Sequence, residues 1–179
     1  MAMRTGRGNR DLPPLEPQDL ERLALFYAGR YAVTRAKLRS YLKRKLRERG
    51  WQGESEPAVE NLVQRFSELG YVDDRGFAAA RAEALGRRGY GLRRVGQALK
   101  AAGIEEEDGA PALERAREDA WSSALRFAER RRIGPFAAQP ADRPQREKAL
   151  AAMLRAGHPL ELARRLVHAN PGEIPPGDD

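Results

Sequence analysis

The stretch that decides the fold runs from Gly70 to Ile104 and reads GYVDDRGFAAARAEALGRRGYGLRRVGQALKAAGI. It contains two apolar stripes at helical spacing, one on each side of a corner that holds Gly89 and Gly91. The stripes consist of Phe77, Ala78, Ala82 and Leu85, and then of Leu92, Val95, Leu99 and Ala102. Glycine adopts positive φ at little cost, so the pattern predicts two helices that meet at a sharp corner.

The ends of these two helices are marked by residue type. Asp73 or Asp74 can accept backbone N–H bonds at the start of the first helix, which we expect to end near Arg88. Gly103 is placed to stop the second helix. Adjacent carboxylates could also hold a metal or act as acid and base, but the helix-capping interpretation is the simpler one.

The rest of the chain carries the same helical pattern, and no alternating run of β-branched residues appears. Thr34 is placed to cap a helix that Gly50 stops. Prolines and glycines predict a break near 109–111 and a loop from 134 to 144. The predicted helices cover about 17–29, 35–49, 57–69, 73–88, 92–102, 105–132 with that break, 145–156 and 160–169. The fold class is therefore all-α.

Three of the predicted helix starts look alike. Thr34, Gly91 and Pro159 each precede apolar residues four and eight positions later. Helical hairpins that bury one stripe each must stack on neighbours to complete a core, which predicts an elongated, curved array of repeats. The alternative is that any three amphipathic helices align this well.

Composition narrows the class of protein. The net charge of +7 and the isoelectric point of about 10.1 favour an anionic partner such as nucleic acid. The absence of cysteine excludes disulfides and Cys-ligated zinc. The longest apolar run, Leu23 to Ala28, is too short to span a bilayer. We expect a soluble cytoplasmic protein.

Two segments concentrate the positive charge. The predicted helix from 35 to 49 has eight cations and only Glu48 as an acid, and no acid lies between positions 87 and 100. A charge run of this kind is either a solvated face or a contact surface for an anion. Tyr27, Tyr31 and Tyr41 lie close to the first segment, where they either stack on exposed bases or pack between helices.

Catalytic and cofactor signatures find no support. His158 and His168 lack a neighbouring cysteine or a suitable carboxylate pattern, so they do not suggest a metal site. The glycines of GRRGYG follow a helix and lack the spacing of phosphate-binding loops. No serine has a partner histidine at a recognisable spacing. We expect no enzyme activity, no cofactor and no metal.

The motifs GYVDDRGFA and RRGYGLRRVGQALKAAGI closely resemble those of the RecX regulatory proteins. The family pattern is Gly-Tyr-hydrophobic-Asp-Asp-x-x-Phe/Tyr-Ala, then Lys/Arg-Gly-x-Gly, then an apolar-rich helix that ends in Gly-Ile. The resemblance is strongest over 61–104, weaker over 23–46 and loose over 121–169. It implies three-helix repeats, which we place over 18–70, 71–118 and 119–169. Composition predicts a flexible basic arm over 1–17 and a disordered tail over 170–179.

The resemblance also implies a function. RecX-like proteins bind the RecA recombinase on single-stranded DNA and suppress filament growth, strand exchange, ATPase and coprotease activity, in DNA repair and the SOS response. They are not enzymes. We expect this chain to be a monomeric RecA regulator that lies along the groove of the filament. The alternatives are a DNA- or RNA-binding protein independent of RecA, and a helical scaffold for another protein.

The family pattern indicates one group of residues, and the two basic segments together with the matched Arg88–Arg94 stretch indicate a second. Those expected to shape the corner are Tyr71, Asp73, Asp74, Phe77, Gly89, Gly91 and Gly103. Those expected to contact RecA or DNA are Arg35, Lys37, Arg39, Lys43, Arg44, Lys45, Arg47, Arg87, Arg88, Tyr90, Arg93, Arg94 and Lys100. One departure concerns the first repeat, which commonly has Ser-x-x-Glu-Leu. Here Thr34 keeps the cap, but Lys37 replaces the acid before Leu38.

Overall fold

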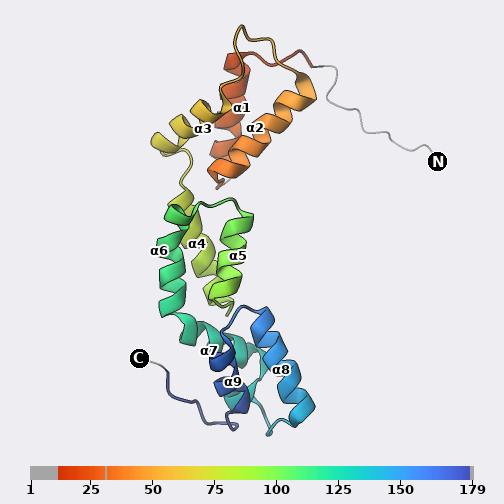
Figure 1. The fold of residues 1–179 in the computed structure, drawn as a ribbon, viewed down its shortest axis with the longest axis vertical. Coiled ribbons are helices and arrows are strands. Elements are labelled where there is room, and N and C mark those ends of the chain that lie inside the picture. The colour runs from red at the N-terminus through yellow and green to blue at the C-terminus, as the bar shows by residue number, and fades with distance from the viewer. Residues whose placement is uncertain (1–11, 31, 178–179) are drawn as a thin grey trace, which may run out of the picture. The chain divides into compact units, whose positions relative to one another are not determined.

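The computed structural model describes residues 12–30 and 32–177 of the chain (Figure 1). Regular structure in these residues is helical, apart from one isolated parallel bridge between Leu15 and Trp51. The all-α fold class is thus confirmed. The chain divides into two compact units, one up to Asp74 and one from Arg75 onward. The elongated, curved shape and the repeat boundaries stay predictions.

The first unit is built on three helices, with α2 packed against both α1 and α3 (Figure 1). Their bounds are Pro17–Arg30 for α1, Arg35–Arg49 for α2 and Val59–Glu68 for α3, close to the predicted ranges. Leu38 and Leu42 of α2 are completely buried in the core, together with Leu20 of α1 and Phe66 of α3. Each such burial stabilises the fold by about 1.5–3 kcal/mol.

The residues that precede α1 take part in this core. Leu15 is fully buried, its N–H donates to the carbonyl of Gly50 at 3.0 Å, and its carbonyl accepts from Gln52 at 3.0 Å. The predicted flexible arm covers residues 1–17, and its three arginines, Arg4, Arg7 and Arg10, lie outside the described residues. The flexibility of that arm stays a prediction, whereas residues 12–16 include a core contact.

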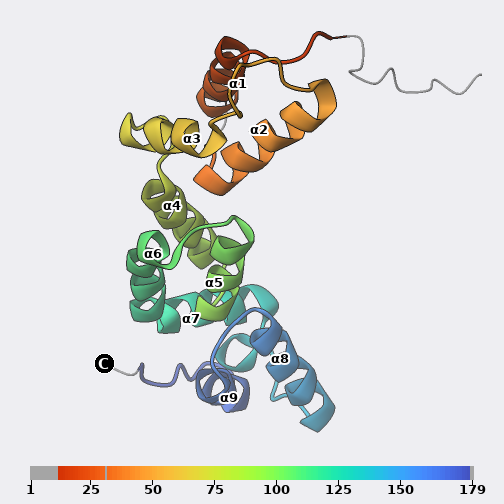
Figure 2. The ribbon, with the colours of Figure 1, turned by 45° about the horizontal axis from the view of Figure 1, so that its top comes forward.

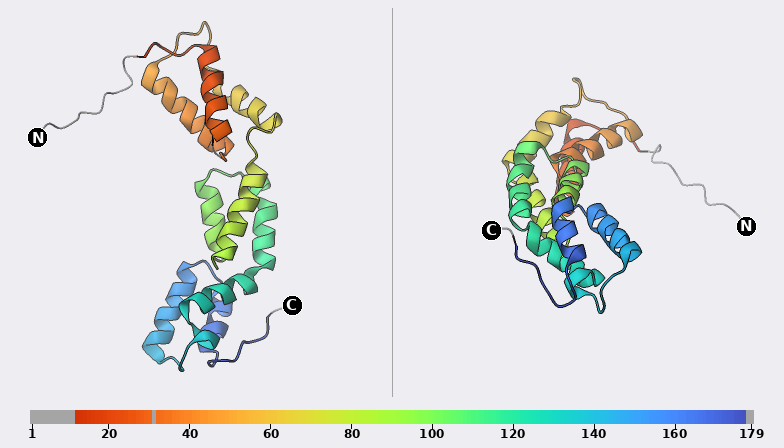
Figure 3. Two further views of the ribbon diagram at one scale, coloured as in Figure 1. Left: turned by 180° about the vertical axis from the view of Figure 1, so that it is seen from behind. Right: turned by 60° about the horizontal axis from the view of Figure 1, so that its bottom comes forward.

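The second unit holds the remaining helices. Their bounds are Asp74–Arg87 for α4, which begins at the last residue of the first unit, Leu92–Ala101 for α5, Glu106–Glu118 for α6, Ala120–Arg131 for α7, Arg143–Arg155 for α8 and Leu160–His168 for α9. A 3-10 turn, η2, spans Gly134–Phe136. Helix α6 packs along α5 (Figure 2), and α8 and α9 lie side by side with α7 against both (Figure 3).

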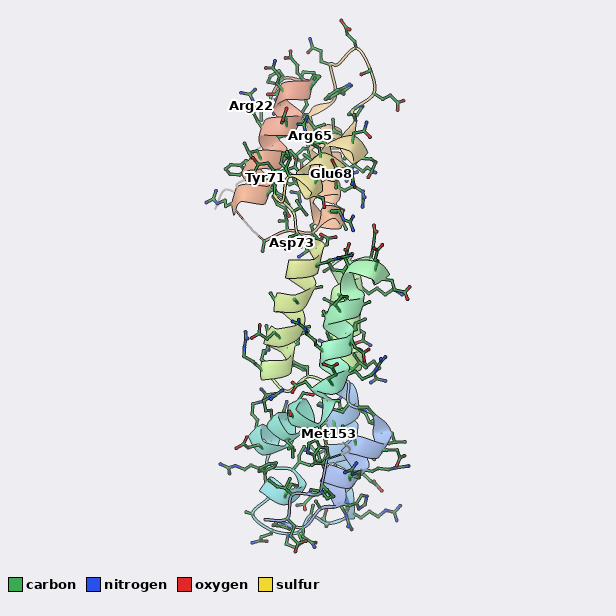
Figure 4. All side chains as sticks on the ribbon, turned by 90° about the vertical axis from the view of Figure 1, so that its left-hand side faces the viewer. Arg22, Arg65, Glu68, Tyr71, Asp73 and Met153 are labelled. Atoms are coloured by element: carbon green, nitrogen blue, oxygen red, sulfur yellow. The ribbon has the colours of Figure 1, made fainter. Side chains whose placement is uncertain are left out.

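Two apolar clusters form the core of the second unit. The first joins α4, α5 and α6 through residues such as Leu85, Val95 and Leu99. The second joins α7, α8 and α9 around Met153, which is fully buried (Figure 4). Tyr90, at the glycine corner, packs against both clusters. The corner predicted from the sequence is therefore where the two clusters meet.

Three features of the helix boundaries differ from the prediction, one of them the boundary at Asp119 that separates α6 from α7. The break expected near 109–111 is absent, and α6 continues through Pro111. Proline inside a helix costs about 3 kcal/mol, but burial of Ala112 and packing of Leu113 on the α4–α5 cluster outweigh that local cost. Helix α8 begins at Arg143, inside the predicted loop, because Asp142 and Gln145 form a reciprocal capping box and proline is tolerated in a first turn.

The segment that follows α9 has no helix up to residue 177. The N–H of Gly172 donates to the carbonyl of Pro135 at 2.8 Å, and the guanidinium of Arg165 donates to the carbonyl of Pro176. The last two residues lie outside the described part of the chain. Disorder of the 170–179 tail stays a prediction, and these two contacts connect its described portion to the helices.

The glycine corner makes backbone-to-backbone contacts with the α7–α9 part of the second unit. Gly89 has φ +69°, and a Cβ there would lie 2.7 Å from the backbone nitrogen of Phe127. A Cβ on Gly91 would lie 2.5 Å from the carbonyl oxygen of Gly157. The N–H of Gly91 donates to the carbonyl of Ala156 at 2.9 Å. Both corner glycines are required because a side chain would meet backbone atoms that cannot give way.

Replacing Gly91 by alanine is therefore expected to destabilise the second unit by about 2 kcal/mol or more, because the new methyl group overpacks against a backbone carbonyl. The measurement is urea unfolding followed by Trp121 fluorescence, with Trp51→Phe as the common background.

Gly96→Ala is the matched control, because Gly96 lies in α5, the helix that Gly91 precedes. A Cβ at Gly96 meets only the end of the Leu113 side chain at 3.7 Å, an ordinary contact. Alanine is the better helix former, so this variant should gain up to about 1 kcal/mol. Equal stability of the two variants would contradict the proposed role of the corner.

Candidate functional site

The cationic face of α2 is largely paired with acids. Asp74 at the start of α4 pairs with Arg35 at 3.2 Å, and Glu60 of α3 pairs with Arg39 at 2.6 Å and Lys43 at 2.9 Å. Within α2, Glu48 pairs with Arg44 at 3.6 Å and Lys45 at 2.7 Å. Within α2 itself Glu48 is the only acid, so a count of charges along this helix overestimates the positive charge that is left without an acid partner.

Glu60 shows the effect of this pairing on an acid. Hydrogen bonds from Lys43 and then Arg39 lower the pKa of the Glu60 carboxyl below its ordinary value. Arg47 is exposed and forms no ion pair with any acid in the described residues. Surface pairs contribute little stability, but they reduce the potential that an incoming anion meets.

Asp74 caps a helix other than the one it begins. Its Oδ1 accepts the backbone N–H of Arg35 at 2.9 Å, and its Oδ2 accepts from Nε of the same residue at 3.2 Å. Thr34 Oγ1 accepts the N–H of Lys37 at 3.2 Å, as predicted. The first turn of α2 thus has a local cap and a distant one. A cap of α4 by Asp73 stays a prediction.

The tyrosines beside α2 pack on each other. The rings of Tyr27 and Tyr41 lie parallel, with centroids 4.1 Å apart and an interplanar angle of 2°. Both rings are half-buried against the core of the first unit, and the guanidinium of Arg44 lies 5.5 Å from the Tyr41 centroid. This arrangement supports the packing interpretation over base stacking. Tyr31 lies outside the described residues.

The second basic segment follows a different pattern. Gly89 and Gly91 are buried at the corner, whereas the arginines around them and Lys100 at the end of α5 are exposed. Arg87 pairs with Glu83 on α4. The guanidinium groups of Arg88 and Arg94 lie 5.3 and 6.0 Å from the Tyr90 ring centroid, and Arg93 donates to the carbonyl of Leu154.

A mostly apolar cavity of about 480 Å³ lies in the second unit between α4, α6 and α7. Alanine is the commonest residue of its lining, to which Tyr90, Val95 and Ser123 also contribute. Two ion pairs, Glu83 with Arg87 and Asp119 with Arg126, lie on its lining. The hydroxyl of Ser123 donates to the carbonyl of Ala120 at 3.0 Å.

His158 is buried at the glycine corner. Its Nε2 lies 3.0 Å from the carbonyl oxygen of Gly89, its ring lies 5.5 Å from the ring of Phe127, and its Nδ1 has no hydrogen-bond partner. Burial lowers the pKa of this imidazole. His168, in contrast, is exposed on α9. The described residues contain no group of three potential metal-ligating side chains, and none of the described helices has the length and apolarity to cross a bilayer.

Comparison with known proteins identifies the family. No family model matches the chain. The regulatory protein RecX of Myxococcus xanthus is 32% identical over 176 residues, which span 92% of both chains. The RecX protein of Stenotrophomonas maltophilia is 32% identical over 141 residues, which cover 79% of this chain and 83% of the relative. The RecX protein of Thermus thermophilus is 36% identical over 103 residues, which cover 58% of this chain and 69% of the relative. The chain belongs to the RecX family.

Solved RecX structures share the fold. The crystal structure of RecX from Lactobacillus salivarius superposes with a TM-score of 0.61 at 17% identity, over 84% of this chain and 93% of that chain. Another RecX regulatory protein gives a TM-score of 0.58 at 20% identity, over 84% of this chain and 72% of that one. The resemblance noted from the sequence motifs is therefore confirmed at the level of family and helical fold.

The RecX motif residues lie at turns and helix starts. Tyr71 is about half exposed and its ring centroid lies 5.3 Å from that of Phe66, while Asp73 is exposed just before α4 (Figure 4). Phe77 is half-buried on α4, and Gly103 ends α5 with φ +72°. The ring contact of Tyr71 is with the adjacent helix α3. The role of these residues in shaping the glycine corner stays a prediction.

Removing the Asp74 carboxylate is expected to destabilise the first unit. Asp74→Ala leaves the Arg35 N–H and its partly buried guanidinium without this acceptor, which should cost about 2–3 kcal/mol. Asp74→Asn retains an oxygen acceptor for the N–H and should recover part of the loss. Glu60→Ala removes only exposed pairs and should cost less than about 1 kcal/mol. Urea unfolding, followed by the fluorescence of Trp51 in a Trp121→Phe background, measures the stability of all three variants. If Glu60→Ala lost more free energy of unfolding than Asp74→Ala, this role of Asp74 would be contradicted.

His158 should make the stability of the second unit depend on pH. The unfolded chain binds a proton near pH 6.5, whereas the folded chain resists it until lower pH. The free energy of unfolding should therefore fall below about pH 6.5, by at most about 1.4 kcal/mol per pH unit, with no effect of this group at higher pH. Unfolding between pH 5 and 8 measures the slope. His158→Gln should flatten it and His168→Gln should not; identical slopes would contradict this assignment.

Proposed function

We propose that this RecX-family protein binds the RecA recombinase and RecA filaments on single-stranded DNA, and that it negatively modulates recombinase activity. The observation that carries the proposal is family membership over 92% of the chain. The affected steps would be filament extension, strand exchange, ATP hydrolysis and coprotease activity. The protein would act in the cytoplasm as a monomer.

The charge distribution supports this target. The single-stranded DNA of such a filament carries a phosphate at every nucleotide, and this chain carries a net charge of +7. The exposed arginines at the glycine corner and along α2 are able to bond phosphate or carboxylate oxygens in bidentate fashion. The candidate contacts in the first unit and those in the second are both retained in this proposal.

The protein would act by occupying a binding surface on the filament and not by catalysing a reaction. We infer that the protein lies along the groove of the filament and blocks the addition of RecA monomers or the access of partner proteins. A modulator of this kind needs no cofactor and no catalytic residue. Its effect should scale with the amount bound, so suppression should saturate at a fixed ratio of this protein to RecA.

The test is the ATPase activity of RecA on single-stranded DNA during titration with the full chain. We expect dose-dependent suppression that weakens as salt rises, because several ionic contacts are broken together. The same titration on RecA without DNA controls for effects on the assay. Unchanged ATPase activity at a stoichiometric excess would overturn the proposal.

A second candidate function is DNA or RNA binding that does not require RecA. The arginines of the corner favour it, because Arg88, Arg93 and Arg94 are exposed and form no ion pair with an acid in the described residues. It predicts salt-sensitive binding to naked single strands and no suppression of RecA beyond what DNA masking explains. Measuring the suppression with limiting DNA and again with excess DNA separates the two functions. A protein that only covers the DNA stops suppressing RecA when uncovered DNA is abundant.

A further inference from the structure

Arginines from two distant parts of the sequence gather at the glycine corner. Arg88, Arg93 and Arg94 lie on either side of the corner itself, and Arg130 and Arg131 lie at the end of α7. Helix α7 passes next to this corner (Figure 2), where the backbone of Phe127 approaches Gly89. We call these five residues the corner arginine cluster. Sequence reasoning selected the first three and missed the last two.

Contacts with rings and carbonyl groups connect the members of the cluster. Arg130 donates to the backbone carbonyl of Arg88, so the two segments are joined directly. The guanidinium groups of Arg130 and Arg131 lie 5.9 and 5.7 Å from the Phe127 ring centroid. Arg88 and Arg94 lie beside Tyr90 in the same way. These contacts order the guanidinium planes and leave most of their N–H groups free.

No carboxylate neutralises the cluster among residues 12–30 and 32–177. The nearby acids Glu83 and Asp119 pair with Arg87 and Arg126, which lie outside the cluster. Glu129 is exposed on α7 and forms no ion pair with any of the five. The face of α2 differs, because Glu48, Glu60 and Asp74 pair with five of its cations. The cluster is therefore the stronger local source of positive potential.

The ligand that fits this surface is a chain of phosphates. A guanidinium group matches the geometry of a phosphate with two parallel hydrogen bonds, and several of them side by side suit a polymer with regularly spaced charge. Phe127 is buried, so its ring offers no face on which a base could stack. Tyr90 is half-buried, and the guanidinium groups of Arg88 and Arg94 lie beside its ring, where a base would compete with them. Recognition would thus involve the backbone and not the base sequence.

We propose that the corner arginine cluster is the main phosphate-binding surface of this protein, and that it binds the sugar-phosphate backbone of single-stranded nucleic acid. The face of α2 is then secondary. This proposal depends on the proposed function in one respect, namely that the single-stranded DNA of the RecA filament is part of what the protein binds. An acidic protein surface is the competing ligand, and the test distinguishes it.

The test compares two double variants with the same change in charge. Arg94→Glu with Arg131→Glu changes one residue from each side of the cluster, and neither side chain forms a hydrogen bond in the described residues, so folding should be spared. Lys43→Glu with Arg44→Glu makes the same change on α2. Circular dichroism confirms the helical content of both. Binding is measured by the fluorescence anisotropy of labelled oligothymidylate over a range of NaCl concentrations.

We expect the cluster variant to bind at least about tenfold more weakly than the wild type, and the slope of log K against log salt to shrink by about 1.4 for two lost contacts. The α2 variant should change affinity by less than about threefold. Arg94→Lys with Arg131→Lys keeps the charge, so it should preserve the slope while losing some affinity with the bidentate geometry. Oligonucleotides of mixed sequence should bind equally well.

Three results would overturn the proposal. Equal losses in the two charge-reversal variants would indicate a general effect of net charge, and a larger loss in the α2 variant would place the main surface there. If the wild type does not bind oligothymidylate but still suppresses RecA ATPase activity, the phosphate site is excluded while the proposed function stands. In that case, weaker capture of DNA-free RecA by the cluster variant would identify an acidic protein surface as the ligand.

Discussion

The close approach of two backbones at the glycine corner is the constraint on which the second unit depends. Gly91 lies against Gly157 so tightly that a methyl group would reach within 2.5 Å of a carbonyl oxygen. The N–H of Gly91 then finds its acceptor in Ala156, and His158 reaches the carbonyl of Gly89. Backbone groups buried in this way need partners, so the corner satisfies a requirement of folding as well as of packing.

Fixing the backbone at the corner also determines where its side chains point. With Gly89 and Gly91 buried, the arginines at 88, 93 and 94 are left exposed around a half-buried Tyr90. The same approach brings the end of α7 alongside, because Phe127 is the residue that Gly89 contacts. One packing contact therefore joins the two apolar clusters of the second unit and assembles a cationic surface from two separate segments.

Local patterns in the sequence were sufficient for most of the fold. Helices such as α2 and α5 were predicted nearly to the residue, because Thr34, Gly50, Gly91 and Gly103 mark their ends chemically. The prediction was wrong at Pro111, where packing of the α6 face overrides a residue that disfavours helix locally. It was wrong again at the start of α8, where the capping box of Asp142 was overlooked.

The candidate site was harder to predict, because charge neutralisation depends on tertiary contacts. A count along α2 gives eight cations to one acid, yet Glu60 and Asp74 come from other helices to pair with three of those cations. The predicted contact residues do not include Arg130 and Arg131, because the prediction rests on the charge runs over 35–49 and 87–100. The sign of a surface depends on which charges the fold brings together, and a linear count cannot supply that. An arginine held by an aromatic ring and a carbonyl keeps its charge available to a ligand, whereas one held by a carboxylate does not.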